Sequence, residues 1–416
     1  MSFADNYFCR FNSLPKIFID NPYKETGIIV VIPCYDDEYV FRTLESLDNA
    51  KPPKCKTEII IIINSGENSS QQSIANNHLI YNKLKQQKEE SFYKNFDIYV
   101  HNIENIPKKI AGVGNARKTG MDEAVRRFNS INNADGIIVS LDADCLVDKN
   151  YFVEIEDYYK NKPKSGACTI QFQHDFNPDN YSYEIMSACR LYEIYLRYFR
   201  LALKYSGYPS PIHTIGSCFS VKAQSYIKVG GMSQRQGGED FYFLHKLTKM
   251  TKVGTINKAI VFPSPRISDR VPFGTGPAVN KIVSDKSYKV YNFELFNILK
   301  KFFSCYDELY SNSQIADLNI PDEVTKYIGI DNLISIVNEC KKNTNSIQSF
   351  RKRLQSKLDA FFIIKFLNSF DEQSDYPPVD VITAASQLLT EFRITTDQTA
   401  ISVYDAIFEK DNELEK

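Results

Sequence analysis

The chain of 416 residues contains no tryptophan and no excess of charge of either sign. Its 50 lysines and arginines stand against 51 aspartates and glutamates, a balance that argues against a nucleic-acid partner or a polybasic membrane-surface protein. Glycine and proline, 17 of each, are scarce, and 43% of the residues are hydrophobic, which excludes disordered and fibrous classes. The length predicts a globular chain of two to three domains of about 150 residues each.

Paired cysteines and long apolar runs are also missing. The nine cysteines include no Cys-x-x-Cys pair, so the sequence predicts neither a disulfide framework nor a cysteine zinc site and favours a reducing compartment. No stretch approaches the roughly 18 apolar residues that span a bilayer, and the N-terminus lacks the basic and apolar regions of a signal peptide. We expect a cytoplasmic protein, with peripheral contact at the inner face of a membrane left open.

Strand and helix signals alternate along the first 150 residues. Short β-branched runs end in turn-forming residues, as strands buried in a parallel sheet do, and apolar residues recur at helical spacing between them. The expected strands are 28–32, 59–63, 97–100 and 136–141, and the expected helices are 39–47 and 115–128. This order predicts an α/β sheet with helices on both faces.

The pattern of secondary-structure signals changes towards the C-terminus. A tyrosine-rich helical pattern spans 181–205, and strand and helix signals continue to alternate to about 282. From there to the end, apolar residues recur at helical spacing with few strand signals. We predict an N-terminal extension (1–24), an α/β domain (25–282) and a helical C-terminal region (283–416). The polar stretch 71–95 is expected only to lie on the surface.

The sharpest motif is Asp142-Ala143-Asp144, at the end of the fourth expected strand. Alternate residues of an extended segment point the same way, so both carboxylates face the strand's carboxyl end, where open α/β sheets bind ligands. Two close carboxylates repel each other, and a divalent cation keeps both ionised. Oxygen ligands favour Mg²⁺ or Mn²⁺. The alternative is a pair of solvated loop acids.

Two further motifs surround helix starts. Gly237-Gly238-Glu239-Asp240 leads into a helical pattern; its acids can cap the helix, or one of them can take a proton from an attacking hydroxyl. The glycine-rich turn at 112–120 carries Arg117 in its first helical turn, where it can neighbour a phosphate. As a dinucleotide fingerprint this turn is weak, because it does not directly follow a strand.

In their order along the chain, these motifs resemble those of the family 2 glycosyltransferases with the GT-A fold. The resemblance covers roughly residues 27–262, and matching segments lie both before and after the acidic motif. The matching segments are Pro33-Cys-Tyr35-Asp-Asp37-Glu38, Gly114-x-Ala116-Arg117, Asp142-Ala-Asp144, Gly216-Ser-Cys-Phe, Val229-Gly230-Gly231-Met and Glu239-Asp240.

The resemblance implies transfer of a sugar, with inversion, from a nucleotide-diphosphate donor to an acceptor hydroxyl of a glycan, lipid or small molecule. It implies that Asp240 is the base of a Glu239-Asp240 catalytic pair, that Asp144 ligates Mn²⁺ or Mg²⁺, and that Asp142 contacts the ribose or the metal. The positions then expected around the nucleotide sugar are Pro33, Tyr35, Asp37, Asn64, Gly114, Arg117 and Asp142.

Two positions depart from the pattern. Asn64 stands where many relatives have an aspartate that accepts a hydrogen bond from uracil, and Asn64 can accept only through its carbonyl oxygen, so uridine is less secure as the base. Downstream, some members supply a histidine metal ligand. Here the Pro/Gly-rich segment carries Arg266 and Arg270, which we expect to clamp the diphosphate, with a plain surface loop as the alternative.

The acceptor side is weakly marked. His174 lies where this side of the cleft should begin and is a weak candidate for an acceptor contact; otherwise it is a structural histidine. The 181–205 helix, with its interleaved tyrosines and arginines, is interpreted as core-facing with arginines that reach solvent; an acceptor groove or a membrane surface is the alternative.

Two other functions compete with the transferase. A degenerate glycosyltransferase that acts as a non-catalytic scaffold is kept open by Asn64, although Asp142, Asp144 and Asp240 argue against it. A sugar-nucleotide pyrophosphorylase requires a phosphate-gripping glycine-rich loop after the first strand, where this chain has an acidic, glycine-free turn. The oligomeric state, the sugar and the linkage are not marked in the sequence.

Overall fold

The computed structural model describes residues 2–11, 15–268, 274–312, 314–315 and 318–413. The chain forms two compact units. The first holds the residues up to Met186 together with Thr214–Asn280, and the second holds Ser187–His213 together with the residues from Lys281 onwards. Residues 187–213, which lie inside the expected α/β domain, thus cluster with the C-terminal helices.

The first unit is built on one mixed sheet, in the order β3-β2-β1-β4-β7-β6-β8-β5 within the described residues. β1, β2, β3 and β4 run parallel, whereas β7 is antiparallel to β4 and β6. The sheet consists of β1 (Thr26–Cys34), β2 (Lys56–Gly66), β3 (Asp97–Ile106), β4 (Ile137–Ser140), β5 (Leu146–Val147), β6 (Ser165–Phe172), β7 (Phe219–Lys222) and β8 (Lys252–Phe262).

The centre of this sheet is the core that the β-branched runs predicted. Val30 on β1 pairs with Ile59 on β2 and Val139 on β4, and all three side chains are fully buried. Strands flanked on both faces by helices need apolar side chains in both directions, which continuous runs of isoleucine and valine provide. The four predicted strands are confirmed, and so are the two predicted helices.

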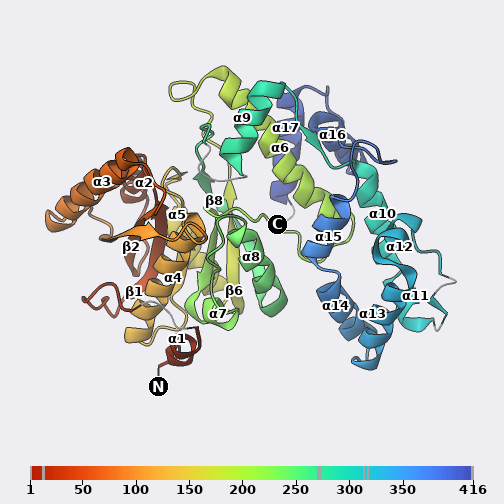
Figure 1. Ribbon diagram of the computed structural model, residues 1–416, viewed down its shortest axis with the longest axis horizontal. Helices are drawn as coiled ribbons and strands as arrows, with labels where there is room; N and C mark the ends of the chain where they lie inside the picture. The colour runs from red at the N-terminus through yellow and green to blue at the C-terminus, as the bar shows by residue number, and fades with distance from the viewer. Residues whose placement is uncertain (1, 12–14, 269–273, 313, 316–317, 414–416) are drawn as a thin grey trace. The chain divides into compact units, whose positions relative to one another are not determined.

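Helices cover both faces of the sheet. The chain moves outward from β1 through β2 to β3 and then returns to β4, so right-handed crossovers place α2 (Val40–Asp48) and α3 (Gln71–Glu89) on one face and α4 (Val113–Ser130) on the other (Figure 1). The remaining helices of this unit are α1 (Asp5–Phe11), α5 (Tyr151–Asn161), α7 (Ala223–Lys228) and α8 (Glu239–Met250). The predicted α/β organisation is confirmed.

The N-terminal segment packs against α4. The hydroxyl groups of Tyr7 and Tyr226 both donate to Asp122 at 2.8 Å, and the backbone N–H of Ile17 donates to the buried carboxylate of Glu123 at 3.2 Å. Buried carboxylates need such donors, because an unpaired one costs several kcal/mol. These contacts fix the helix that carries Arg117, whose position as the fifth residue of α4 lies just beyond the predicted first turn.

The second unit is helical. It contains most of α6 (Tyr183–Tyr205), the end of α9 (Thr275–Asp285), and a two-strand pair of β9 (Lys289–Val290) with β10 (Val379–Asp380). Its other helices are α10 (Phe293–Ser304), α11 (Tyr306–Ser311), α12 (Asp322–Ile328), α13 (Ile330–Lys342), α14 (Ile347–Lys357), α15 (Ala360–Leu367), α16 (Val381–Glu391) and α17 (Ala400–Glu413). The predicted helical C-terminal region is confirmed.

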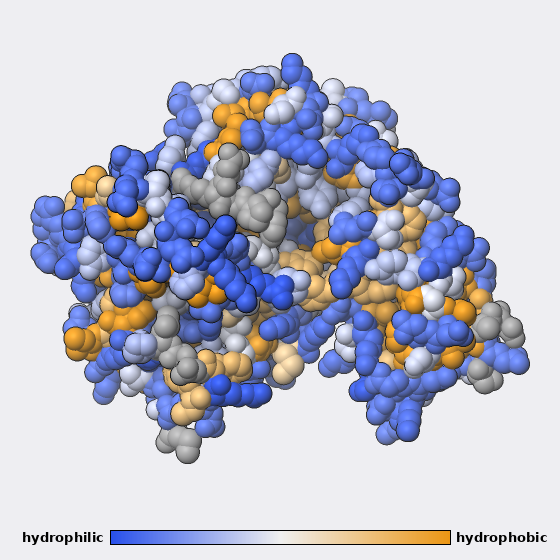
Figure 2. Space-filling view, viewed as in Figure 1, coloured by the Kyte–Doolittle hydropathy of each residue, from blue (hydrophilic) through white to orange (hydrophobic). Residues whose placement is uncertain are grey.

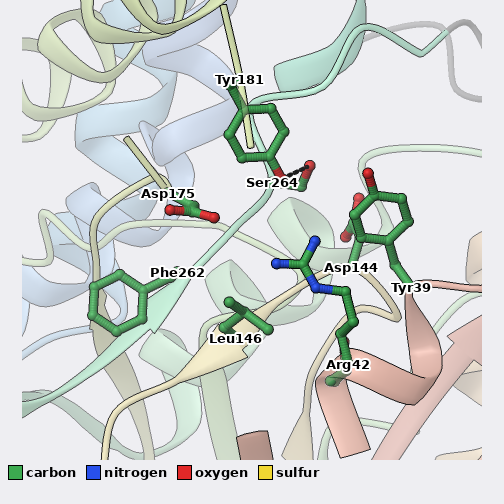
Figure 3. Close-up of a pocket in the computed structure, with 9 residues that line it drawn as sticks. Tyr39, Arg42, Asp144, Leu146, Asp175, Tyr181, Phe262 and Ser264 are labelled. Carbon is green, nitrogen blue, oxygen red and sulfur yellow. Dashed lines mark hydrogen bonds between the residues drawn. The ribbon is translucent and has the colours of Figure 1, made fainter. Parts of the chain in front are cut away.

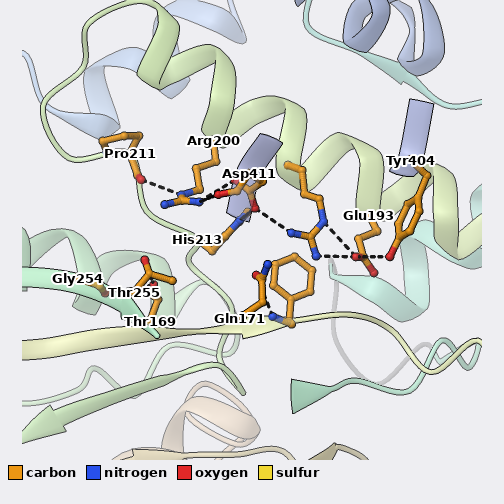
Figure 4. A network of polar contacts seen from close by, with 12 residues as sticks. Thr169, Gln171, Glu193, Arg200, Pro211, His213, Gly254, Thr255, Tyr404 and Asp411 are labelled. Atoms are coloured by element: carbon orange, nitrogen blue, oxygen red, sulfur yellow. Dashed lines mark hydrogen bonds and ion pairs between the residues drawn. The ribbon is translucent and has the colours of Figure 1, made fainter. Parts of the chain in front are cut away.

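A buried network of charges joins α6 to α17 in the second unit (Figure 4). Asp411 on α17 accepts from Arg197 at 2.8 Å, from Arg200 at 2.7 Å and from His213 at 2.8 Å. Burial alone would raise the pKa of Asp411, but the neighbouring His213 and Arg200 hold it below its usual range. The expectation that these arginines reach solvent is wrong, because Asp411 supplies their counter-charge inside the unit.

The Asp411→Asn substitution is expected to lower the free energy of unfolding by about 3–5 kcal/mol, because it leaves two buried guanidinium groups without their shared carboxylate. Denaturant unfolding of the full chain measures this change. Asp405→Asn, on the exposed side of the same helix, is the matched control and is expected to change stability by less than about 0.5 kcal/mol. Equal stability of the two variants would contradict the role assigned to Asp411.

Exposed apolar side chains are spread over several elements. Ile19 in the N-terminal segment, Leu79 on α3 and Tyr183 on α6 are the most exposed large ones. On the face shown in Figure 2, hydrophobic residues surface in small groups between hydrophilic ones. Within the described part of the chain, no helix combines the length and apolarity that crossing a membrane requires.

Candidate active site

The candidate site lies at the carboxyl ends of three neighbouring parallel strands. β1 lies between β2 and β4, so the residues that follow these strands meet at one edge of the sheet. Asp37 follows β1, Asn64 is near the end of β2, and Asp142 and Asp144 follow β4. The predicted donor-site residues from three separate segments are therefore brought together.

The turn after β1 is tied to α3. Asp36 adopts a left-handed backbone conformation (φ 49°), and its carboxylate accepts from the side chains of Ser73 and Asn76 at the start of α3. Short polar side chains that bond locally tolerate this conformation. The Tyr35 hydroxyl donates to Ser69 at 3.2 Å, and Pro33 lies within β1. Asp36, which lies between Tyr35 and Asp37 in the chain, is thus held in one conformation by α3.

Asn64 fastens the end of β2 to the start of α4. Its side-chain amide donates to the carbonyl oxygen of Gly112 at 2.9 Å, and its side chain is buried. The amide nitrogen is therefore engaged, which leaves the Oδ1 atom as the acceptor that Asn64 can offer to a base.

Two glycines make room for the first turn of α4 and its arginine. A Cβ at Gly114 would run into the backbone carbonyl of Arg235. A Cβ at Gly216 would lie 2.8 Å from a guanidinium nitrogen of Arg117. The motif residue Gly216 therefore serves Arg117, which is 99 positions earlier in the chain, by leaving space for its head group.

Arg117 joins the acidic motif to the start of α8. Its guanidinium donates to Asp142 and to Glu239, and both Arg117 and Glu239 are almost fully buried. Burial alone would lower the pKa of Arg117, but these two carboxylates and that of Asp240 raise it. The buried Nε–H of Arg117 has no hydrogen-bond partner among the described residues, so this cation retains a donor for a ligand.

Asp240 is the acid of this cluster whose pKa lies near neutrality. Burial and the neighbouring Glu239 carboxylate raise the pKa of Asp240 to about 7, whereas Arg117 acts to lower it. The side chain lies in the first turn of α8 and accepts from the backbone N–H of Phe241 at 2.7 Å. A carboxylate with a pKa near the working pH is suited to general base catalysis.

Asp144 and Asp37 share one guanidinium. Arg266 donates to Asp37 with both of its terminal nitrogens, one of them at 3.1 Å, and its Nη2 lies 2.9 Å from Asp144 Oδ2. Arg266 thus lies beside Asp37 and Asp144 and pairs with both acids. Arg270 lies outside the described residues.

The donor set suits a hard divalent cation that is shared with a substrate. Asp144 and Asp142 offer carboxylate oxygens, the ligands that Mg²⁺ and Mn²⁺ prefer. Among the described residues no group of three acidic, histidine or cysteine side chains is clustered as a metal cage would require. One or two carboxylates with substrate phosphates completing the shell are the usual arrangement for Mg²⁺, so these residues fit a cation held jointly with a diphosphate.

A pocket of about 220 Å³, which includes open solvent, borders Asp144 (Figure 3). The sequence motifs did not mark this pocket, because its walls come from segments far apart along the chain. The Arg42 side chain points into it, and the Tyr181 hydroxyl is hydrogen-bonded to Ser264 at 3.1 Å. It is lined by Tyr39, Arg42, Thr43, Asp144, Leu146, Asp175, Tyr181, Phe262 and Ser264.

His174 is buried beside the pocket's strand segments. Its Nε2 lies 3.2 Å from the hydroxyl of Thr275, and its ring packs edge-on against Phe172. The structure therefore places this candidate in a packed position with a hydrogen-bond partner.

Acids, a buried arginine and a carboxylate with a raised pKa gathered at the carboxyl edge of a mixed sheet are the groups expected of an enzyme active site. Residues 29–230 match the model of glycosyl transferase family 2. The match confirms the resemblance over residues 29–230, which form a glycosyl transferase family 2 domain, and the protein is therefore a glycosyltransferase.

Solved structures with a similar chain path include S. aureus TarS 1–349 in complex with UDP-GlcNAc, at 12% identity and a TM-score of 0.42, covering 80% of this chain and 91% of that one. PcManGT from Pyrobaculum calidifontis, a mannosyltransferase in complex with GDP-Man and Mn²⁺, is 13% identical with a TM-score of 0.38, covering 99% and 94%. No curated protein matches the sequence.

Proposed function

We propose that the protein is a metal-dependent, inverting glycosyltransferase in which Asp240 is the general base. The observation that carries the proposal is the position of Asp240: it adjoins the Arg117–Asp142 pair at the sheet edge, and its pKa is raised to about 7. Such a group is largely ionised at slightly alkaline pH and still basic enough to accept a proton.

In the proposed reaction Asp240 takes the proton of an acceptor hydroxyl. The acceptor oxygen forms a bond to the anomeric carbon of the donor while the bond from that carbon to the diphosphate oxygen breaks, and the electron pair leaves with the diphosphate. Attack from the face opposite the leaving group inverts the configuration. Glu239 positions Arg117, whose charge faces the site.

The leaving diphosphate gains negative charge as its bond breaks, and fixed cations stabilise that charge. Arg117 and Arg266 supply two such charges from this chain. Asp144, together with Asp142, would hold Mn²⁺ or Mg²⁺, which when bound supplies further charge for the same phosphates. The carboxylate oxygens of these two aspartates are ligands that Mn²⁺ and Mg²⁺ prefer.

The nucleoside is proposed to lie along the ends of β1 and β2. Pro33, Tyr35 and Asp37 border it on one side, and Asn64 and Gly114 on the other. Asn64 is proposed to accept from the base through Oδ1, because its amide nitrogen is held by Gly112. Arg270 is also proposed to contact the diphosphate.

The acceptor is proposed to be a glycan, lipid or small molecule, and His174 remains a weak prediction for its contact. A cytoplasmic location with peripheral contact at the inner face of a membrane is proposed. The nine cysteines, all free in the structure, support a reducing compartment.

The proposal is tested by incubating the full chain with UDP-, GDP-, CDP- and dTDP-sugars and Mn²⁺, with and without mixed acceptors, and measuring release of the nucleoside diphosphate. Turnover with one donor, strengthened by an acceptor and lost in Asp240→Asn, is the expected result. Tight donor binding without release of diphosphate under any condition would favour a non-catalytic scaffold.

A further inference from the structure

Arg266 occupies the place between two site carboxylates where a cation would be expected. It grips Asp37 with both terminal nitrogens and reaches Asp144 at 2.9 Å. Asp37 is buried, and Asp144 is about one quarter exposed. The guanidinium therefore supplies a counter-charge to the acid proposed to bind the metal.

Tyr39 holds this arginine from a second direction. The guanidinium carbon of Arg266 lies 4.8 Å from the centre of the Tyr39 ring, and that of Arg42 lies 5.3 Å from it. The backbone N–H of Tyr39 also donates to Asp37 at 3.2 Å. Stacking on an aromatic ring and a bidentate carboxylate contact together specify an arginine rather than a lysine at this place.

The arrangement leaves one donor of Arg266 unsatisfied. Its Nε–H is buried and has no hydrogen-bond partner among the described residues. A phosphate group can receive two parallel N–H bonds from a guanidinium, so a diphosphate offers Arg266 a full set of acceptors that the two aspartates do not. The contact with Asp144 is therefore one that a phosphate can replace.

We infer that Arg266 makes metal binding conditional on the diphosphate: its guanidinium holds Asp144 in the ligand-free protein and moves to the donor phosphates when a divalent cation takes that carboxylate. The inference rests on the proposed function. Cation and guanidinium repel each other at a shared carboxylate, so Mn²⁺ alone has to displace Arg266 with no new partner for it. With a diphosphate present, Mn²⁺ and the Arg266 guanidinium can both bind phosphate oxygens.

The test measures Mn²⁺ affinity directly, by the electron paramagnetic resonance signal of free Mn²⁺, with and without UDP or GDP. In the wild-type chain, the fitting nucleotide is expected to raise Mn²⁺ affinity strongly. In R266M, Mn²⁺ alone is expected to bind about tenfold or more tightly than in the wild type, and the gain on adding nucleotide shrinks by a similar factor.

R42M is the matched control, because Arg42 lies on the same tyrosine ring and lines the pocket that Asp144 borders, but no described carboxylate forms an ion pair with it within 4 Å. Its Mn²⁺ affinity is expected to rise much less than that of R266M, since Arg42 does not hold the carboxylate directly. If R266M does not fold, R266Q replaces it, since its amide can still donate to buried Asp37 while removing the charge; the same increase is expected.

Equal Mn²⁺ affinity in the wild type and the neutral Arg266 variant, or an equal rise in R42M and R266M, would overturn the inference. If the wild type binds a nucleotide with Mn²⁺ in that case, the proposed function stands and only the role of Arg266 fails. If no variant and no wild-type sample binds any nucleotide diphosphate with Mn²⁺, the proposed function itself fails.

Discussion

Asp240→Asn is expected to lower kcat for sugar transfer by about 10²–10⁴-fold, because an amide cannot take the proton of the acceptor hydroxyl. The donor Kd should change little, since the substitution keeps the shape of the side chain and leaves the Arg117 contacts to Asp142 and Glu239 in place. Steady-state kinetics with the identified donor, together with calorimetric donor binding, measure both quantities.

The same assignment predicts the pH dependence of the wild-type enzyme. Burial and Glu239 raise the pKa of Asp240 to about 7, with Asp142 adding to the rise and Arg117 opposing it. Because the base must be ionised, kcat/KM is expected to fall about tenfold per pH unit below pH 7 and to level off above it. Asp240→Asn should lose this acid limb.

Asp157→Asn is the matched control for the loss of a carboxylate, because Asp157 lies exposed on α5. Its kcat and pH profile should equal those of the wild type. Transfer by Asp240→Asn at more than one tenth of the wild-type rate would remove Asp240 from the role of base.

Asp144→Ala is expected to abolish the part of nucleotide binding that depends on metal. Asp144 is the carboxylate proposed to hold the cation with the donor phosphates, and a one- or two-carboxylate site does not survive the loss of its main ligand. Titration calorimetry of the nucleotide with and without Mn²⁺ measures the change. The metal-dependent gain seen in the wild type should be absent in the variant.

The control for Asp144→Ala is Asp157→Ala, which removes an exposed carboxylate on α5. It is expected to retain the wild-type gain from Mn²⁺. An Asp144→Ala variant with an unchanged gain would show that the cation is held elsewhere and would contradict the ligand assignment.

Much of the sheet could be predicted from the sequence, because buried parallel strands require the apolar runs that stand out at 59–63 and 28–32. α3 could not be predicted, because its residues are mostly polar and only three of them are buried. The burial of Arg197 and Arg200 on α6 could not be predicted either, since Asp411, their counter-charge, lies more than 200 positions away. Local patterns do not contain such partners.

For the site, the order of the motifs predicted which acids gather at the sheet edge. It did not predict which arginine pairs with which acid. Arg117 reaches Asp142 and Glu239, and Arg266 joins Asp37 to Asp144, across separations that range from 25 to 229 positions. These pairings depend on the packing of α4 and of the segment after β8, which the sequence pattern does not specify.

The central claim is that the carboxyl edge of β1, β2 and β4 binds a nucleoside diphosphate with a divalent cation. Thermal unfolding of the full chain with UDP, GDP, CDP, dTDP or ADP, each with and without Mn²⁺, tests it most directly. One nucleotide is expected to stabilise the protein only with Mn²⁺, by roughly 2.7 kcal/mol at about 100 times its Kd. No shift with any nucleotide at millimolar concentration would contradict the account.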